Sequence, residues 1–181
     1  MKKGLYILGK LNDSDVEWLI AKGKRSSLPA NTLLIQEGKP NDALYIVLDG
    51  DFSITVGAPN GRELGRTGAG EVLGEVSFID SRPPMATVTA TQPSLVLSIS
   101  RAALEEKLRT DTGFASRFYH ALASFLADRL RAGASIIAYN KNEQLRDDVE
   151  YEDELDTDFL DNVAMAGARF ETILRRLRGS G

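Results

Sequence analysis

The spacing of apolar positions changes along the chain, and each change marks a different kind of element. Between about residues 28 and 99 the apolar residues form short or alternating runs that are separated by glycine-containing turns. Regular short runs of this kind predict strands of an antiparallel sandwich or roll. The candidate strands are Leu33–Ile35, Ala43–Leu48, Phe52–Val56, Val72–Leu73, Thr87–Ala90 and Leu95–Ile99. Asn60-Gly61 predicts a hairpin turn, because Asn and Gly tolerate the positive φ angles that such turns require.

Helical spacing flanks this β-rich region on both sides. Before it, Leu11–Ile20 predicts a short helix with Asn12 as its N-cap and Asp15 three residues later. After it, a helix is expected over Ser100–Leu108, with the serine as its N-cap. A last amphipathic helix is predicted over residues 159–178.

The longest helix is predicted over residues 113–140. Its apolar positions recur at intervals of three and four residues and include Phe118, Leu122, Phe125, Leu126, Leu130, Ile136 and Ile137. The resulting stripe is wide. It fits packing onto the β-rich region, and it also fits pairing with a second long helix in a dimer; both interpretations stay open.

These elements together predict a mainly β fold with flanking helices, an antiparallel β-roll or jelly roll followed by a long C-terminal helix. We divide the chain into a β-roll with its N-terminal helix (1–112), the long helix (113–140), an acidic linker (141–158) and a terminal helix (159–178). A chain of 181 residues is long enough to bury a core of its own.

Composition removes several classes of function. The chain has no cysteine, which excludes disulfides, thiolate metal sites and cysteine nucleophiles. It has no apolar run of about 18 residues, so neither a transmembrane helix nor a membrane partner is expected, and a cytoplasmic location is predicted. The single histidine, His120, lies within the long helix, and no serine sits in a nucleophile elbow. We therefore expect no catalytic residues, no metal and no cofactor.

Charge is distributed unevenly. Residues 141–161 contain ten Asp and Glu against one Lys and one Arg, a local balance of −8 in a chain whose formal charge is −4. A strongly acidic segment repels phosphate backbones, which argues against direct DNA binding there. About 40 residues follow the long helix, fewer than a winged helix-turn-helix with a basic recognition helix requires.

The stretch Gly74–Ala90 reads GEVSFIDSRPPMATVTA. It resembles the phosphate-binding cassette of the cyclic-nucleotide-binding (CNB) domain family, which usually has Gly-Glu, a short helical turn and then Arg-Ala-Ala-Thr-Val-x-Ala. Gly74 and Glu75 match the opening, and residues 86–90 match the close. The family's phosphate-pairing arginine falls on Pro84, a residue with neither a charge nor an N–H donor.

The resemblance extends over roughly residues 8–140, because Leu28–Gly38 and Asn41–Gly50 are similar to the family's opening strands. It implies a β-roll that binds a nucleotide, and a long helix that covers the ligand and often dimerises subunits. It also implies that Glu75 accepts a hydrogen bond from a ribose hydroxyl, although this carboxylate would equally cap the short turn after it. Thr87 matches a phosphate contact and equally suits an ordinary strand.

Two further patterns bear on the ligand. Arg82 lies two residues before Pro84 and is a candidate substitute for the missing arginine, although two prolines stiffen the loop after it. Arg62 and Arg66 have an Arg-x-x-x-Arg spacing that is similar to that of several cyclic-di-GMP receptors, since arginines pair with guanine and stack on purines. The same spacing also describes two solvated charges on a hairpin.

We therefore predict a non-catalytic second-messenger receptor that signals through its C-terminal helices to a partner. Cyclic di-GMP is favoured narrowly over cyclic AMP or cyclic GMP. The alternative is a degenerate CNB fold that binds no nucleotide and serves protein association. The partner is a second copy or another chain, such as an activator-type transcription factor, held through residues 114–140. The predicted ligand-binding residues are Arg62, Arg66, Gly74, Glu75, Val76, Arg82, Met85, Ala86 and Thr87.

Overall fold

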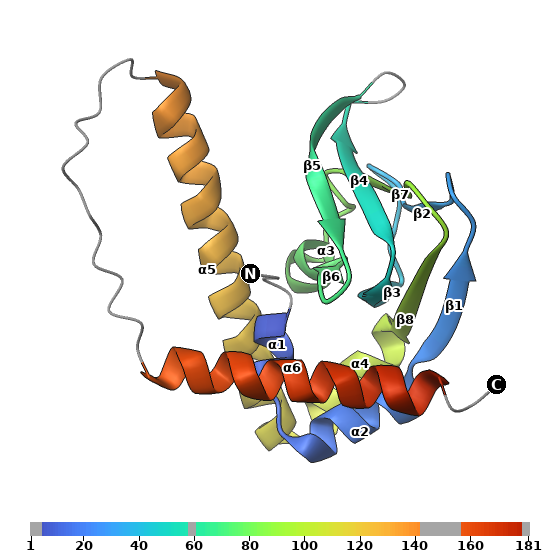
Figure 1. The fold of residues 1–181 in the computed structure, drawn as a ribbon, viewed down its shortest axis with the longest axis vertical. Coiled ribbons are helices and arrows are strands. Elements are labelled where there is room, and N and C mark those ends of the chain that lie inside the picture. The colour runs from blue at the N-terminus through green and yellow to red at the C-terminus, as the bar shows by residue number, and fades with distance from the viewer. Residues whose placement is uncertain (1–4, 58–60, 142–156, 179–181) are drawn as a thin grey trace.

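Two antiparallel sheets of four strands each form a roll, with several of the helices gathered at one end of it (Figure 1). This computed structural model describes residues 5–57, 61–141 and 157–178. One sheet has the strand order β1-β8-β3-β6 and the other β2-β7-β4-β5. The strands are β1 (Lys24–Leu28), β2 (Leu33–Ile35), β3 (Ala43–Asp49), β4 (Asp51–Val56), β5 (Arg62–Gly68), β6 (Val72–Leu73), β7 (Thr87–Ala90) and β8 (Ser94–Ser100). The predicted fold class is confirmed.

Two strands lie outside the predicted set, and both are edge strands. β1 pairs only with β8, and β5 pairs only with β4. Their sequences, KRSSL and RELGRTG, are polar and carry charges, which is how proteins protect a sheet edge from pairing with other chains. An apolar pattern therefore does not reveal them. The turn at 58–60 between β4 and β5 lies outside the described residues.

Six helices are described, and their capping follows the sequence closely. They are α1 (Leu5–Lys10), α2 (Asp13–Lys22), α3 (Glu75–Asp80), α4 (Arg101–Thr110), α5 (Thr112–Lys141) and α6 (Thr157–Arg178). Asn12 and Asp15 form a reciprocal capping box at the start of α2, each side chain accepting the other's backbone N–H at 2.9 Å. Ser100 caps α4 by accepting the N–H of Ala103. None of the described helices combines the length and apolarity that a bilayer crossing requires.

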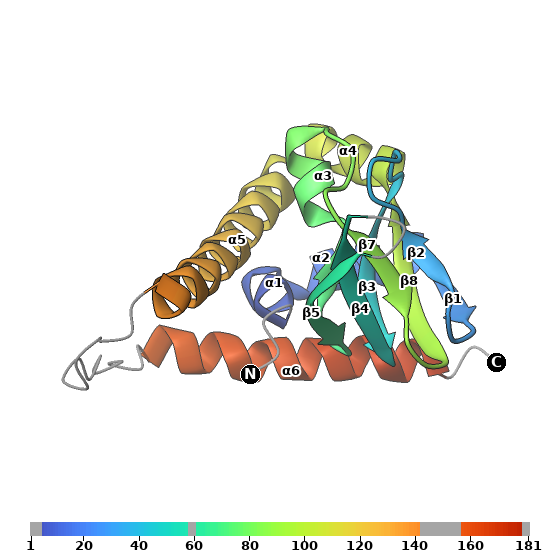
Figure 2. The ribbon, with the colours of Figure 1, turned by 90° about the horizontal axis from the view of Figure 1, so that it is seen from above.

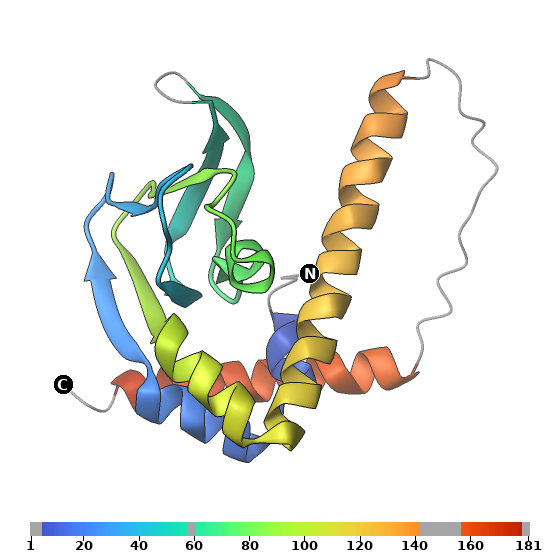
Figure 3. The ribbon, with the colours of Figure 1, turned by 180° about the vertical axis from the view of Figure 1, so that it is seen from behind.

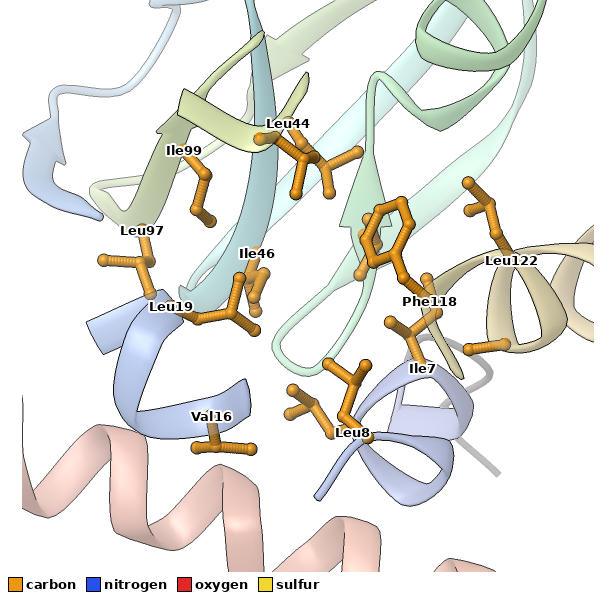
Figure 4. Packing of buried hydrophobic residues seen from close by; sticks show 14 of the residues in the cluster. Ile7, Leu8, Val16, Leu19, Leu44, Ile46, Leu97, Ile99, Phe118 and Leu122 are labelled. Carbon is orange, nitrogen blue, oxygen red and sulfur yellow. The ribbon is translucent and has the colours of Figure 1, made fainter. Parts of the chain in front are cut away.

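The core is divided into two clusters. The cluster between the sheets takes side chains from both of them, namely Ile35, Val47, Phe52, Leu73, Val88, Ala90 and Val96. The larger cluster fills the space between the β3–β8 sheet and the helices, as Figure 4 shows for Leu44, Ile46, Leu97 and Ile99 facing Ile7, Leu8, Val16, Leu19, Phe118 and Leu122. The first half of α5 is therefore part of this core, whereas Leu130 farther along the helix is 75% exposed.

α6 crosses the helical end of the molecule and packs on α1 and α2 (Figures 1 and 2). Ile173 of α6 is fully buried in the larger cluster. Arg169 reaches the last carbonyls of α1, donating to Leu8 O and Gly9 O at 3.1 Å each. Since the final carbonyls of a helix have no partner within it, this arginine satisfies them from outside. α6 begins two residues before the predicted position 159, and the acidic segment 142–156 lies outside the described residues.

The base of α5 is fixed by a two-pronged ion pair. Arg117 donates from Nε and Nη2 to the Asp15 carboxylate of α2 at 2.6 and 2.8 Å. Burial alone raises the pKa of Asp15, but the hydrogen bonds from Arg117 and from the Asn12 backbone outweigh it, and the net pKa is lowered. The carboxylate is thus charged and paired, and the start of α5 is held against α2.

Candidate functional site

A cavity of about 470 Å³ is lined by residues of α3, of the roll and of α5. Figure 3 shows α3 on the side of the roll that faces α5. Most of its lining is apolar and comes from the roll and the cassette: Ile35, Ile54, Val56, Leu64, Leu73, Val76, Pro84, Met85, Ala86 and Val88. Gly74 and Ser77 also line it, and so do two charged residues, Glu75 and Arg129. Among the residues that the structure describes, the cavity therefore offers a ligand a largely apolar wall with a single pair of opposite charges.

The turn that starts the cassette requires glycine. Gly74 has φ of +88° and immediately precedes α3. A Cβ atom there would lie 2.6 Å from Asn41 Nδ2 and 2.8 Å from Ala43 O, two atoms that are hydrogen-bonded to each other at 2.7 Å. Both the backbone conformation and the available space therefore exclude a side chain, which places α3 close against β3.

Glu75, the first residue of α3, is buried at the cavity and pairs with a residue distant in sequence. It is 2% exposed, and its Oε1 accepts a hydrogen bond from Nη1 of Arg129 on α5. Burial raises the pKa of Glu75, and the Arg129 guanidinium partly offsets this, while the nearby Glu71 adds to the rise. The carboxylate that was expected to cap a turn or bind ribose therefore also connects the cassette to the long helix.

Arg129 is the functional-site candidate that sequence reasoning missed. Its guanidinium carbon lies 4.5 Å from the centroid of the Phe125 ring, one helical turn earlier on α5. Its side chain is 34% exposed, so one side faces the cavity and water while the other is held by the ring and by Glu75. No motif surrounds it in the sequence; its position on the predicted long helix was the only available signal.

The cassette helix is also connected to α5 within the core. The ring of Phe78 in α3 meets that of Phe118 edge to face, with centroids 5.9 Å apart and an interplanar angle of 82°. Arg101 covers the other side, with its guanidinium 5.2 Å from the Phe78 centroid and a hydrogen bond to Ser77 O. Because α3 contacts α5 at two levels, movement of the cassette changes the contacts of the long helix.

Several predicted ligand-binding residues lie together at the cavity. Gly74, Glu75, Val76, Met85 and Ala86 all line it. Their roles as ligand contacts stay predictions, but the cassette does gather them around one space. Val76 and Met85 are exposed at 37% and 70%, which places apolar surface at the cavity mouth.

Other predicted residues are directed elsewhere. The hydroxyl of Thr87 accepts the N–H of Glu37 at 3.1 Å, which ties β7 to the turn after β2. Arg82 is exposed and is not among the lining residues; its backbone N–H donates to Asp80 Oδ1 at 3.0 Å. Pro84 is buried, and its carbonyl accepts the N–H of Gly38 at 2.8 Å.

Arg62 and Arg66 are separated by a β-bulge. The pairing of β4 with β5 shifts at Leu64, so that Arg66 lies opposite Ser53 and Arg62 opposite Val56. Directly opposed residues of an antiparallel pair share a face, and Ser53 and Val56 lie on different faces of β4. Arg66 turns away from the cavity to Glu63 at 3.1 Å and Asp51 at 3.7 Å, on the face of Ser53. One extra residue in a strand reverses the alternation beyond it, which the four-residue spacing could not reveal.

The described residues contain no group of three or more His, Cys, Asp or Glu side chains that could hold a metal ion. The chemistry that the site offers is therefore hydrogen bonding and ion pairing by Glu75 and Arg129, next to an apolar surface.

Residues 25–111 match the family model of the cyclic nucleotide-binding domain. A cyclic nucleotide-binding domain from Methylobacillus flagellatus has a similar structure, with a TM-score of 0.69, 26% identity and coverage of 80% of this chain and 85% of that one. The cyclic-di-GMP-responsive global regulator CLP of Xanthomonas campestris has a TM-score of 0.59 and 27% identity, with coverage of 71% of this chain and 65% of that one.

An uncharacterized NTE family protein of Mycobacterium tuberculosis is 28% identical over 124 residues, which are 68% of this chain. The match spans about a fifth (21%) of the length of that relative. The similarity therefore concerns one domain of a longer protein in that case.

Proposed function

Because the chain belongs to the cyclic nucleotide-binding domain family, we propose that it is a regulatory domain that receives a cyclic nucleotide in the cavity beside α3 and signals through α5. The observation that carries this proposal is the ion pair between Glu75 and Arg129, which joins the lining of the cavity to the long helix. A ligand that contacts either residue has a different affinity for different positions of α5. Such a difference is what allows a ligand to shift a conformational equilibrium. The proposed function is therefore binding, without catalysis.

Cyclic di-GMP is the first ligand to test. Pro84 removes the guanidinium that would pair with a cyclic mononucleotide in the usual pose. Arg62 lies opposite Val56, a cavity residue, and this position supports a contact between its guanidinium and a purine of a larger ligand. Structural similarity to a cyclic-di-GMP-responsive regulator supports the same choice.

Isothermal titration calorimetry with cyclic di-GMP, cyclic AMP and cyclic GMP tests both levels of this proposal. We expect Arg62→Ala to weaken cyclic di-GMP binding about tenfold, since it removes one charge-assisted contact. Arg66→Ala is the matched control, because Arg66 lies on the opposite face, and it should change the affinity less than twofold. If only cyclic AMP gives heat, the proposed receptor function stands and the preference for cyclic di-GMP is wrong. If none of the three nucleotides gives heat, the proposed receptor function is wrong.

A second candidate function is protein association without any nucleotide. It is favoured by Pro84 in the cassette and by Glu75, whose charge Arg129 already neutralises. The exposed Leu130 on α5 then belongs to an interface with a second copy or with another long helix, such as that of an activator-type transcription factor.

Sedimentation velocity tests this association. Leu130→Asp is expected to convert a wild-type dimer to monomer, because it places a charge in the proposed apolar interface. Leu33→Asp is the control, since Leu33 is 50% exposed on the sheet at β2. A wild-type protein that is monomeric at all concentrations, or a dimer that Leu130→Asp leaves intact, contradicts self-association through this part of α5.

A further inference from the structure

The cassette has Pro84 in place of an arginine, but another arginine, Arg129, lines the cavity. Of the described arginines near the cassette in sequence or space, Arg129 alone lines the cavity; Arg62, Arg66, Arg82 and Arg101 do not. Arg66 is engaged by carboxylates outside the cavity, and Arg82 follows α3 on the exposed loop. An anionic ligand in this cavity therefore meets one positive charge from the described lining, and that charge comes from α5.

We propose that Arg129 is the phosphate-binding residue of this domain and that Glu75 is the positioning residue that orients it. This inference rests on the proposed function, because it assigns the anion contact of the nucleotide in the same cavity. It differs from the family pattern in the element that carries the guanidinium, which is the long helix instead of the cassette. The phosphate would then contact the signalling helix directly.

The geometry leaves Arg129 able to bind an anion without giving up Glu75. Within the described part of the chain, Glu75 is the one group that accepts a hydrogen bond from this guanidinium, and it does so from Nη1. A guanidinium has five N–H donors, so those of Nε and Nη2 remain for the two free oxygens of a phosphodiester. Stacking on Phe125 at 4.5 Å and the bond to Glu75 restrict the side chain to one orientation beforehand. A donor held in place in this way loses less freedom on binding.

The electrostatic balance of the site supports the same assignment. Without a ligand, Glu75 and Arg129 cancel, and the phosphate would bring one extra negative charge close to Glu75. The groups that bear on Glu75 are Arg129 from α5 and Glu71 from the turn before β6, and burial already raises its pKa. Phosphate binding should therefore favour protonation of Glu75, so the nucleotide binds more tightly as pH falls.

The test compares two variants that differ only at Arg129 in a background without the Glu75 charge: Glu75→Gln and Glu75→Gln/Arg129→Gln. In both variants the cavity holds no unpaired carboxylate, so loss of folding does not obscure the result. Calorimetry with cyclic di-GMP and cyclic AMP as probes is expected to show roughly ten- to a hundredfold weaker binding for the double variant. Arg82→Gln in the same Glu75→Gln background is the control and should cost less than threefold.

A second measurement, the pH dependence of nucleotide binding, distinguishes a positioning role of Glu75 from an effect on stability alone. The dissociation constant of the wild-type protein should fall as pH is lowered from 7.5 to 5, and Glu75→Gln should abolish this dependence. Equal affinities of Glu75→Gln and Glu75→Gln/Arg129→Gln for the nucleotide would contradict the role of Arg129 and leave the proposed function standing. A large loss of affinity when Arg82→Gln is added to Glu75→Gln would do the same. Absence of binding by every nucleotide to the wild-type protein overturns both.

Discussion

Arg129→Ala is expected to lower the free energy of unfolding by about 3 kcal/mol at neutral pH. The substitution leaves the carboxylate of Glu75, which is 3% exposed in its side chain, without its partner. Removing one member of a buried ion pair typically costs about 3–5 kcal/mol, and the lower end applies because Arg129 is itself about a third exposed. Urea unfolding followed by circular dichroism measures the change.

The same variant has a defined pH dependence. Burial raises the pKa of Glu75 and Arg129 lowers it, so Arg129→Ala raises it further. When a carboxyl group has a higher pKa in the folded state than in the unfolded state, the free energy of unfolding falls as pH rises from the unfolded-state pKa through the folded-state pKa. The cost of Arg129→Ala should therefore be smaller at pH 5 than at pH 7.5.

A double-mutant cycle with Glu75→Gln isolates the pair. Glu75→Gln/Arg129→Ala should recover at least about 2 kcal/mol of the loss and remove its pH dependence, because a neutral amide needs no counter-charge. Arg66→Ala, which breaks an exposed pair, should change stability by no more than about 0.5 kcal/mol. Additive effects at positions 75 and 129 would show that the two residues do not act as a pair.

Phe118→Ala should destabilise the protein by about 3–5 kcal/mol, the range usual for truncation of a buried aromatic residue. Phe118 is 1% exposed and stacks on Phe114 with centroids 5.6 Å apart, besides its edge-to-face contact with Phe78. The cavity left by the ring would open between α3 and α5. Thermal and urea unfolding both measure this effect.

Tyr119→Ala is the matched control for Phe118→Ala. Tyr119 is the next residue of α5 and is 48% exposed, so its loss should cost about 1 kcal/mol or less. A cost below about 1.5 kcal/mol for Phe118→Ala would mean that the two helices close over the space, and that the contact of Phe78 with Phe118 does not hold α3 in place.

The sequence could predict the elements that depend on residues close together in the chain. The caps at Asn12 and Ser100, and the strands β2, β6 and β7, follow from local spacing and were placed correctly. α1 was not predicted, because six residues nucleate a helix poorly and this one is packed between α5 and α6. The edge strands β1 and β5 were not predicted because their polar sequences, which protect the sheet edges, have no apolar pattern.

The residues of the candidate site also differ in whether the local sequence could predict them. Gly74 and Glu75 form a local motif, and the sequence placed them at the start of one short helix. Arg129 is 54 residues away from Glu75, and only the packing of Phe118 and Phe125 in the core sets which turn of α5 faces the cavity. The bulge at Leu64 likewise depends on the pairing of two strands, so the separation of Arg62 from Arg66 could not be derived from their spacing.

The ion pair of Arg117 with Asp15 and the burial of Phe118, Leu122 and Phe125 hold the first part of α5 in the core. Arg129 lies four residues beyond Phe125, about 6 Å along the axis, and Lys141 ends the helix about 24 Å beyond Phe125 at 1.5 Å per residue. If the part of the helix beyond the core turns as a rigid rod about Phe125, a displacement imposed at Arg129 becomes about fourfold larger at Lys141. A shift of about 0.5 Å at the cavity would become about 2 Å at the end of the helix.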